Sequence, residues 1–151
     1  MIEILQGSGL DVAAIMPVMH DAFDPEFGEA WTAAQCLSTL AMPGGQLLIA
    51  KSDGVVVGFT LSRGVIDEEE LLLIGVLNTA RRRGVGQQLI AKLSEACTQM
   101  GRSVIFLEVR DGNNAHSFYS SIGFKPIGRR SSYYKSTDGS RHDSITMARV
   151  L

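Results

Sequence analysis

Apolar and polar positions repeat with two different periods along the chain, and the changes of period predict the secondary structure. Apolar residues at steps of three and four indicate helices, because such residues line one face of a helix. These steps occur over residues 10–23, after Thr32, over 85–100 and from Ala115 to Ile122. Thr32 is a suitable N-cap for the second of these helices, and Gly101 ends the third.

Strand-like runs lie between the predicted helices, at residues 2–5, 46–50, 55–62, 70–77, 104–109 and 145–150. Asp53-Gly54 separates the second run from the third and is a strong signal for a hairpin. After Glu70 the fourth run is continuously apolar, which suits a strand near the middle of a sheet. The order β-α-α-β-β-β-α-β-α-β, with room for one more strand near the C-terminal end, predicts an α/β (α+β) fold. We expect one mixed sheet with helices on both faces.

Composition narrows the class of protein. At 151 residues, with 45% hydrophobic and 20% charged residues, the chain suits a single domain over 1–151. A formal net charge of −2 predicts no nucleic-acid partner. No apolar window reaches the length of a membrane span and the first residues lack a signal pattern, so we expect no membrane partner and a cytoplasmic location. Cys36 and Cys97 form no C-x-x-C pair and are expected to be reduced core residues, and three scattered histidines give no metal site.

The segment Arg81-Arg82-Arg83-Gly84-Val85-Gly86 lies between a buried strand and an amphipathic helix. Glycines at a helix N-terminus leave successive backbone N–H groups free, and this arrangement with three arginines suits a pyrophosphate. A solvated basic turn is the alternative. The Walker pattern is absent, and a dinucleotide-binding fingerprint fails because Leu89 stands in place of the third glycine.

Three side chains are candidates for proton transfer. Glu108 is the only charge in V-I-F-L-E-V, so it is partly desolvated and suits a general base; pairing with Arg110 or simple exposure is the alternative. Glu70 is a second candidate base, with a solvated acidic turn as its alternative. Tyr119 could protonate a leaving thiolate, because a phenol with a pKa of about 10 and a thiol near 8.5 are close enough, or it could be an ordinary core aromatic.

Four segments together resemble the GNAT acetyltransferase superfamily: L-L-L-I-G-V, R-R-R-G-V-G, F-L-E-V-R and A-H-S-F-Y-S-S-I-G-F. The resemblance covers about residues 46–130. The following G-R-R-S-S-Y-Y-K-S-T-D-G-S-R-H-D-S-I-T-M-A is similar to the RimI-type enzymes, which acetylate the N-terminal alanine of a small-subunit ribosomal protein. The resemblance implies a mostly antiparallel sheet and direct transfer of an acetyl group from acetyl-CoA to a primary amine.

The resemblance also implies roles for particular residues. Main-chain groups of Ile74, Gly75 and Val76, in a strand splayed from the next, would pair with the pantetheine arm. The pyrophosphate would be bound at the basic turn, by Arg81, Arg82, Arg83, Gly84, Val85, Gly86 and Gln87. Glu108 matches the RimI-type base and Tyr119 the acid, whereas Glu70 falls where other branches of the superfamily carry their base.

The sequence departs from the family pattern at three places. Asn78 replaces the usual proline after the central strand, and Leu73 replaces a polar residue. The stretch between Glu108 and Tyr119 is one residue short, which puts Gly112 where an asparagine that contacts coenzyme A is expected. That role is then open to Asn113 or Asn114, either of which could also cap the last helix.

The nature of the acceptor follows in part from amine basicity. An α-amine has a pKa of about 7.7 to 8.0, whereas lysine near 10.4 needs about 3 to 4 kcal/mol of further help from a base. One carboxylate therefore suits the N-terminal α-amine of a protein or peptide, with ribosomal-protein alanine as the best match. A small-molecule amine acetyltransferase and a non-catalytic acyl-CoA-binding module are the alternatives. Tyr133, Tyr134 and the polar loop 136–143 could line a peptide groove or form an ordinary hairpin loop.

Overall fold

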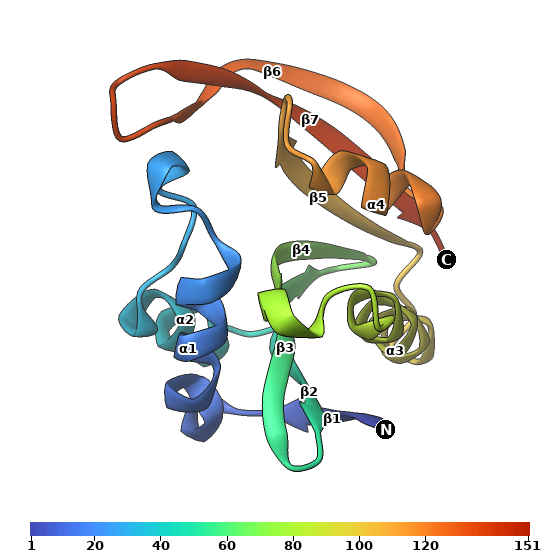
Figure 1. Cartoon of the computed structure of the whole chain (residues 1–151). Coiled ribbons are helices and arrows are strands. Elements are labelled where there is room, and N and C mark those ends of the chain that lie inside the picture. Colours follow the sequence, from blue (N-terminus) through green and yellow to red (C-terminus); the bar gives the residue numbers. More distant parts are fainter.

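A computed structural model describes all residues, 1–151, and folds them around one seven-stranded sheet (Figure 1). Its strand order is β1-β2-β3-β4-β5-β7-β6, with β4 in the middle as expected. Only β4 and β5 run parallel; every other neighbouring pair is antiparallel. The strands are β1 (Ile2–Gly7), β2 (Gly45–Ser52), β3 (Val55–Val65), β4 (Glu68–Val76), β5 (Val104–Arg110), β6 (Lys125–Lys135) and β7 (Arg141–Val150). The predicted fold class and element order are confirmed.

Helices cover both faces of the sheet, with α1 and α2 on one side and α3 and α4 on the other (Figure 1). The helices are α1 (Val12–Ala22), α2 (Ala33–Ala41), α3 (Val85–Gln99) and α4 (Ala115–Ser121), with short 3-10 turns η1 (Gly9–Asp11), η2 (Pro25–Phe27) and η3 (Asn78–Ala80). The first helix begins later than the spacing predicts, because Ser8 and Asp11 cap each other across η1. Thr32 caps α2 as expected and exchanges hydrogen bonds with Gln35.

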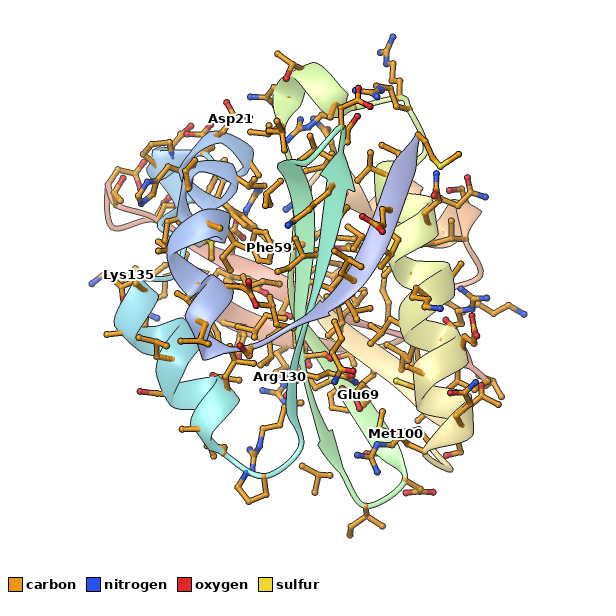
Figure 2. All side chains as sticks on the ribbon, turned by 90° about the horizontal axis from the view of Figure 1, so that it is seen from below. Asp21, Phe59, Glu69, Met100, Arg130 and Lys135 are labelled. Atoms are coloured by element: carbon orange, nitrogen blue, oxygen red, sulfur yellow. The ribbon has the colours of Figure 1, made fainter.

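Two hydrophobic cores lie on the two faces of the sheet. Phe59, labelled in Figure 2, packs with Ile15 and Met19 of α1 in one core. Leu89 and Leu93 of α3 belong to the other. Cys36 and Cys97 are free and fully buried, one in each core, which confirms their expected place. No helix is long and apolar enough to cross a membrane, and no cluster of three or more ligating side chains could hold a metal ion.

A bulge in β4 decides which way its side chains face. Leu61 pairs with Leu73 and Ser62 with Leu71, so Leu72 is an extra residue in the ladder. An extra residue reverses the alternation of side chains. Leu71 therefore packs in the core with α3, whereas Leu73, two residues later, packs in the core with α1.

The parallel pairing of β4 and β5 is short. It comprises three pairs, Glu68–Val104, Glu69–Ile105 and Glu70–Phe106, and then ends. A buried network holds this end together: Glu69 is fully buried and accepts hydrogen bonds from Gln46, Ser62 and Arg102. Beyond Glu70 the two strands are no longer paired, so the main-chain groups of the last part of β4 are free on the side that faces β5.

Candidate active site

A cleft of about 1130 Å³ opens where β4 and β5 separate. We call it the main cleft; it is bordered by the end of β4, the segment from η3 into α3, the start of α4 and the α1–α2 loop. Most of the expected cofactor-binding residues line it, namely Ile74, Gly75, Val76, Arg81, Arg82, Gly84, Val85, Gly86, Gln87 and Asn113. Arg83 does not; its guanidinium Nη2 donates to Ser52 Oγ at 3.0 Å instead.

The N-terminus of α3 leaves several backbone N–H groups without a partner. Gly84 has a positive φ of 77° and offers no side-chain cap, and the first hydrogen bond at this end runs from Gln88 N to Gly84 O at 3.0 Å. The amides of residues 85–87 therefore have no acceptor within the chain. Gly86 leaves room for the Phe118 ring of α4, since a Cβ atom there would lie 3.0 Å from that ring. Free amides, a helix dipole and two arginines on the cleft fit a pyrophosphate.

A second, smaller space of about 400 Å³ adjoins the main cleft, and we call it the side pocket. Both are bordered by the same seven residues, Phe23, Phe27, Glu29, Ile74, Arg110, Asn113 and Tyr119. The side pocket adds Glu70, Glu108, Tyr133 and Tyr134. Two ligands, one in each space, would therefore touch the same side chains, which is the condition for direct transfer between them.

Glu108 is held in the side pocket by the neighbouring strand. Ser144 Oγ donates to its carboxylate at 2.6 Å, and Thr146 Oγ1 lies 2.9 Å from each carboxylate oxygen. Arg130 Nε adds a longer ion pair at 3.7 Å. Arg110, considered from the sequence as a partner of Glu108, pairs with Glu29 instead. The sequence did not single out Ser144 and Thr146, although their alternation with Ile145 and Met147 indicated a polar face on the last strand.

Glu29 and Arg110 form an ion pair at the border of the two spaces. Arg110 Nε lies 3.5 Å from Glu29 Oε2, and its guanidinium stacks 3.5 Å from the centre of the Phe27 ring. Burial raises the pKa of Glu29, and the charge of Arg110 partly offsets that effect. This pair links the α1–α2 loop to the end of β5. No local pattern in the sequence points to Glu29, since it lies in a loop without periodicity.

Glu70 differs from Glu108 although both line the side pocket. Its pKa is raised by desolvation first and by the charge of Glu108 second, and Arg130 and Arg63 partly offset the shift. No hydrogen bond contributes to this balance. Glu70 is thus a half-buried carboxylate without the hydroxyl donors that orient Glu108. It is not the solvated acidic turn that the sequence left open.

Two partly or fully buried tyrosines differ in whether their hydroxyl already has a partner. Tyr119 of α4 is only 9% exposed, packs against Phe118 and Phe124, and borders both spaces. Burial raises its pKa, so the phenol is protonated at neutral pH. Tyr134 donates from its hydroxyl to the main-chain oxygen of Glu108 at 3.1 Å.

From the sequence, the segment that forms the β6–β7 hairpin could line a peptide groove or be an ordinary loop, and each interpretation describes part of it. Tyr133 and Tyr134 line the side pocket from β6. The turn after them is bonded elsewhere: Thr137 donates from N and Oγ1 to the main-chain oxygen of Glu26, at 3.1 and 2.9 Å. The hairpin turn therefore braces the α1–α2 loop beside the pocket.

The asparagines after β5 lie at the edge of the main cleft with Gly112. Asn113 Oδ1 accepts a hydrogen bond from Ala115 N at 2.9 Å and so caps α4. Its side-chain amide nitrogen is the group left to contact a ligand. Asn114 borders the cleft without a capping hydrogen bond.

Comparison with known proteins gives the family. The acetyltransferase (GNAT) domain matches residues 17–142, which is most of the chain. The chain belongs to the GNAT acetyltransferase family. Members of this family use acetyl-CoA, and the free amides at the start of α3 and the adjoining main cleft fit such a ligand.

Two relatives of this chain are N-acetyltransferases according to their names. The chain is 34% identical over 96 residues to the [ribosomal protein bS18]-alanine N-acetyltransferase of Haemophilus influenzae, covering 64% of this chain and 66% of that protein. It is 32% identical over 126 residues to the N-alpha-acetyltransferase RimI of Mycobacterium tuberculosis, covering 80% and 76%. The chain thus spans just under two thirds of the first relative's length.

Solved GNAT structures share the whole fold. The ribosomal-protein-S18-alanine N-acetyltransferase from Escherichia coli superimposes with a TM-score of 0.87 at 28% identity, covering 100% of this chain and 94% of that one. The PaiA N-acetyltransferase from Thermoplasma acidophilum, solved in complex with coenzyme A, gives 0.80 at 19% identity, covering 100% and 99%.

Proposed function

We propose that this protein is an acetyl-CoA-dependent N-acetyltransferase that acts on the N-terminal α-amine of a protein, with a ribosomal-protein alanine as its best substrate. The observation that carries the proposal is the junction of two spaces at Tyr119, one with an anion-binding turn and one with an oriented carboxylate, Glu108. The names of the relatives at 32% and 34% identity support the choice of substrate.

The main cleft binds the acetyl donor in this proposal. Acetyl-CoA supplies the activated acetyl group. The free amides of residues 85–87, with Arg81 and Arg82, bind its pyrophosphate, and the unpaired main chain of Ile74 to Val76 binds the pantetheine arm. Arg83 is left out of this contact because Ser52 accepts its hydrogen bond.

The side pocket binds the acceptor amine. Glu108 accepts a proton from the α-ammonium group, directly or through water, so that a neutral amine can attack the acetyl group. Tyr119 donates a hydrogen bond to the sulfur as negative charge develops there, since its raised pKa keeps the phenol protonated. The second proton, which the amine nitrogen loses after its attack, passes to the departing sulfur, so the products are the amide and the free thiol of coenzyme A. Both side chains border shared space, so the acetyl group passes from one site to the other without a covalent enzyme intermediate.

A single oriented base favours an α-amine over lysine as the acceptor. Of the carboxylates that border the side pocket, only Glu108 is held by hydroxyl donors. A lysine amine, with a pKa near 10.4, demands a stronger base than one carboxylate provides. A cytosolic ribosomal substrate agrees with two free, buried cysteines, and we include a cytoplasmic location in the proposal.

Mass spectrometry of matched peptides tests the proposal. One peptide carries a free N-terminal alanine; the second has the same sequence with a blocked N-terminus and an internal lysine; a third reaction contains a small polyamine. We expect acetylation of the free-alanine peptide alone. Acetylation of the polyamine alone would favour a small-molecule acetyltransferase, and binding of coenzyme A without any transfer would favour a non-catalytic module.

A further inference from the structure

Asp21 and Asn78 join two segments that are far apart in the sequence. Asn78 lies two residues after the end of β4 and begins η3, while Asp21 lies in the last turn of α1. Asn78 N donates to Asp21 Oδ2 at 2.7 Å, and Asn78 Nδ2 donates to the main-chain oxygen and to Oδ1 of Asp21 at 3.2 and 3.3 Å. Figure 1 shows the yellow-green η3 turn beside α1, and Figure 2 labels Asp21 at the end of that helix.

An acid at this place is unfavourable on local grounds. A carboxylate in the last turn of a helix faces the negative end of the helix dipole. It also lies near a turn that binds an anion, where a negative charge weakens the attraction. The hydrogen bonds from Asn78 to the Asp21 carboxylate give this acid partners in spite of both effects. A second link joins the same segments, because Arg81 Nη2 donates to the main-chain oxygen of Ala22 at 3.4 Å.

We propose that Asp21 is a positioning residue for acetyl-CoA binding, which rests on the proposed function. Asp21 acts through Asn78, and Asn78 begins the segment that carries Arg81, Arg82 and the free amides of α3. If the start of this segment moves, the pyrophosphate contacts move with it. Asp21 does not itself line the main cleft, so its effect on the donor is indirect.

The backbone at Leu77 and Asn78 also offers a way to restrain the start of η3 without Asp21. Leu77 has φ −52° and ψ 138°, and this extended ψ is compatible with a proline at the next position. Asn78 is the first residue of a helical turn, where proline is well tolerated because its missing N–H is not needed. Asn78→Pro would replace the hydrogen bonds to Asp21 with a covalent restraint on φ.

The experiment compares donor and acceptor parameters in Asp21 variants of the full chain. We expect Asp21→Ala to raise the KM for acetyl-CoA and the Kd for coenzyme A, measured by calorimetry, about five- to tenfold, which corresponds to about 1 to 1.4 kcal/mol. The kcat and the peptide KM should stay within about twofold. Asp21→Asn keeps an acceptor oxygen and should fall between. His20→Ala, on the exposed surface of the same helix, is the matched control and should change nothing.

The double variant separates positioning from a general effect on folding. In an Asn78→Pro background, Asp21→Ala should change the Kd for coenzyme A less than about twofold. The same loss in both backgrounds, or an unchanged Kd for coenzyme A in Asp21→Ala, would overturn the inference. A wild-type protein that binds no coenzyme A overturns both proposals. The wild-type protein could instead bind coenzyme A but acetylate no peptide, while Asp21→Ala has the expected effects in the wild-type and Asn78→Pro backgrounds. That result overturns only the proposed function.

Discussion

Glu108 and Thr146 are direct cross-strand partners on β5 and β7, and the Thr146 hydroxyl lies 2.9 Å from each oxygen of the Glu108 carboxylate. Ser144, on the same face of β7, donates to that carboxylate at 2.6 Å. Side chains that face each other across an antiparallel pair restrain one another. The proposed base is therefore oriented by the sheet itself before any substrate binds, and no loop closure is needed to place it.

Removing the carboxylate of Glu108 should slow the reaction without weakening the donor site. We expect Glu108→Gln to lower kcat about 100-fold or more and to leave the KM for acetyl-CoA unchanged, because only proton transfer is lost. Steady-state kinetics with the free-alanine peptide measures both. An unchanged kcat would move the role to Glu70, which lines the same pocket.

Thr146→Val provides the control for this result. It removes one hydroxyl donor while keeping the side-chain shape, and we expect kcat to fall about fivefold in the wild-type background. In the Glu108→Gln background the same change should have little effect, since the group that Thr146 orients is already gone. Equal losses in both backgrounds would show that Thr146 acts on something other than Glu108.

Tyr119→Phe should reduce turnover while leaving the fold intact. The ring keeps its packing against Phe118 and Phe124, and only the hydroxyl is lost. We expect kcat to fall about 10- to 100-fold. Because burial raises the pKa of Tyr119, the wild-type phenol stays protonated through pH 10, and kcat should show no decline below that pH from its ionisation. A basic limb below pH 10 that disappears in Tyr119→Phe would contradict this assignment.

Glu70→Gln should stabilise the protein at neutral pH. Burial and the charge of Glu108 raise the pKa of Glu70, so the folded state holds this proton more tightly than the unfolded state. Stability is therefore lost as the pH rises from the ordinary glutamate pKa through the raised one. We expect a Tm higher by about 1 to 3 °C at pH 7 and unchanged near pH 3, where Glu70 is protonated in both the folded and the unfolded state. A gain that is larger at pH 3 than at pH 7 would have the wrong sign.

The order of helices and strands could be predicted from the sequence because hydrophobic period is a local property. The bulge at Leu72 could not, since it depends on how Leu61 and Leu73 pair across the sheet. Glu108 and Tyr119 were found from single patterns and from the family resemblance, and the structure brings both to the side pocket. The Glu29–Arg110 pair joins a loop to a distant strand end, so only tertiary packing creates it.

In the basic turn, too, the sequence alone does not show which side chains reach the main cleft. Two neighbouring arginines there supply a matched test. Arg82 has a positive φ of 63° and lines the main cleft, whereas Arg83 turns away and donates to Ser52. Three consecutive arginines look equivalent in sequence, because the backbone angle that separates them is set by the fold.

We expect Arg82→Gln to raise the KM for acetyl-CoA about five- to tenfold at 0.15 M salt, where screening limits long-range effects to about 8 Å. Arg83→Gln removes the same charge one residue away and should raise it less than about twofold. Equal effects of the two variants would mean that net charge, rather than direct contact, governs binding of the donor at this turn.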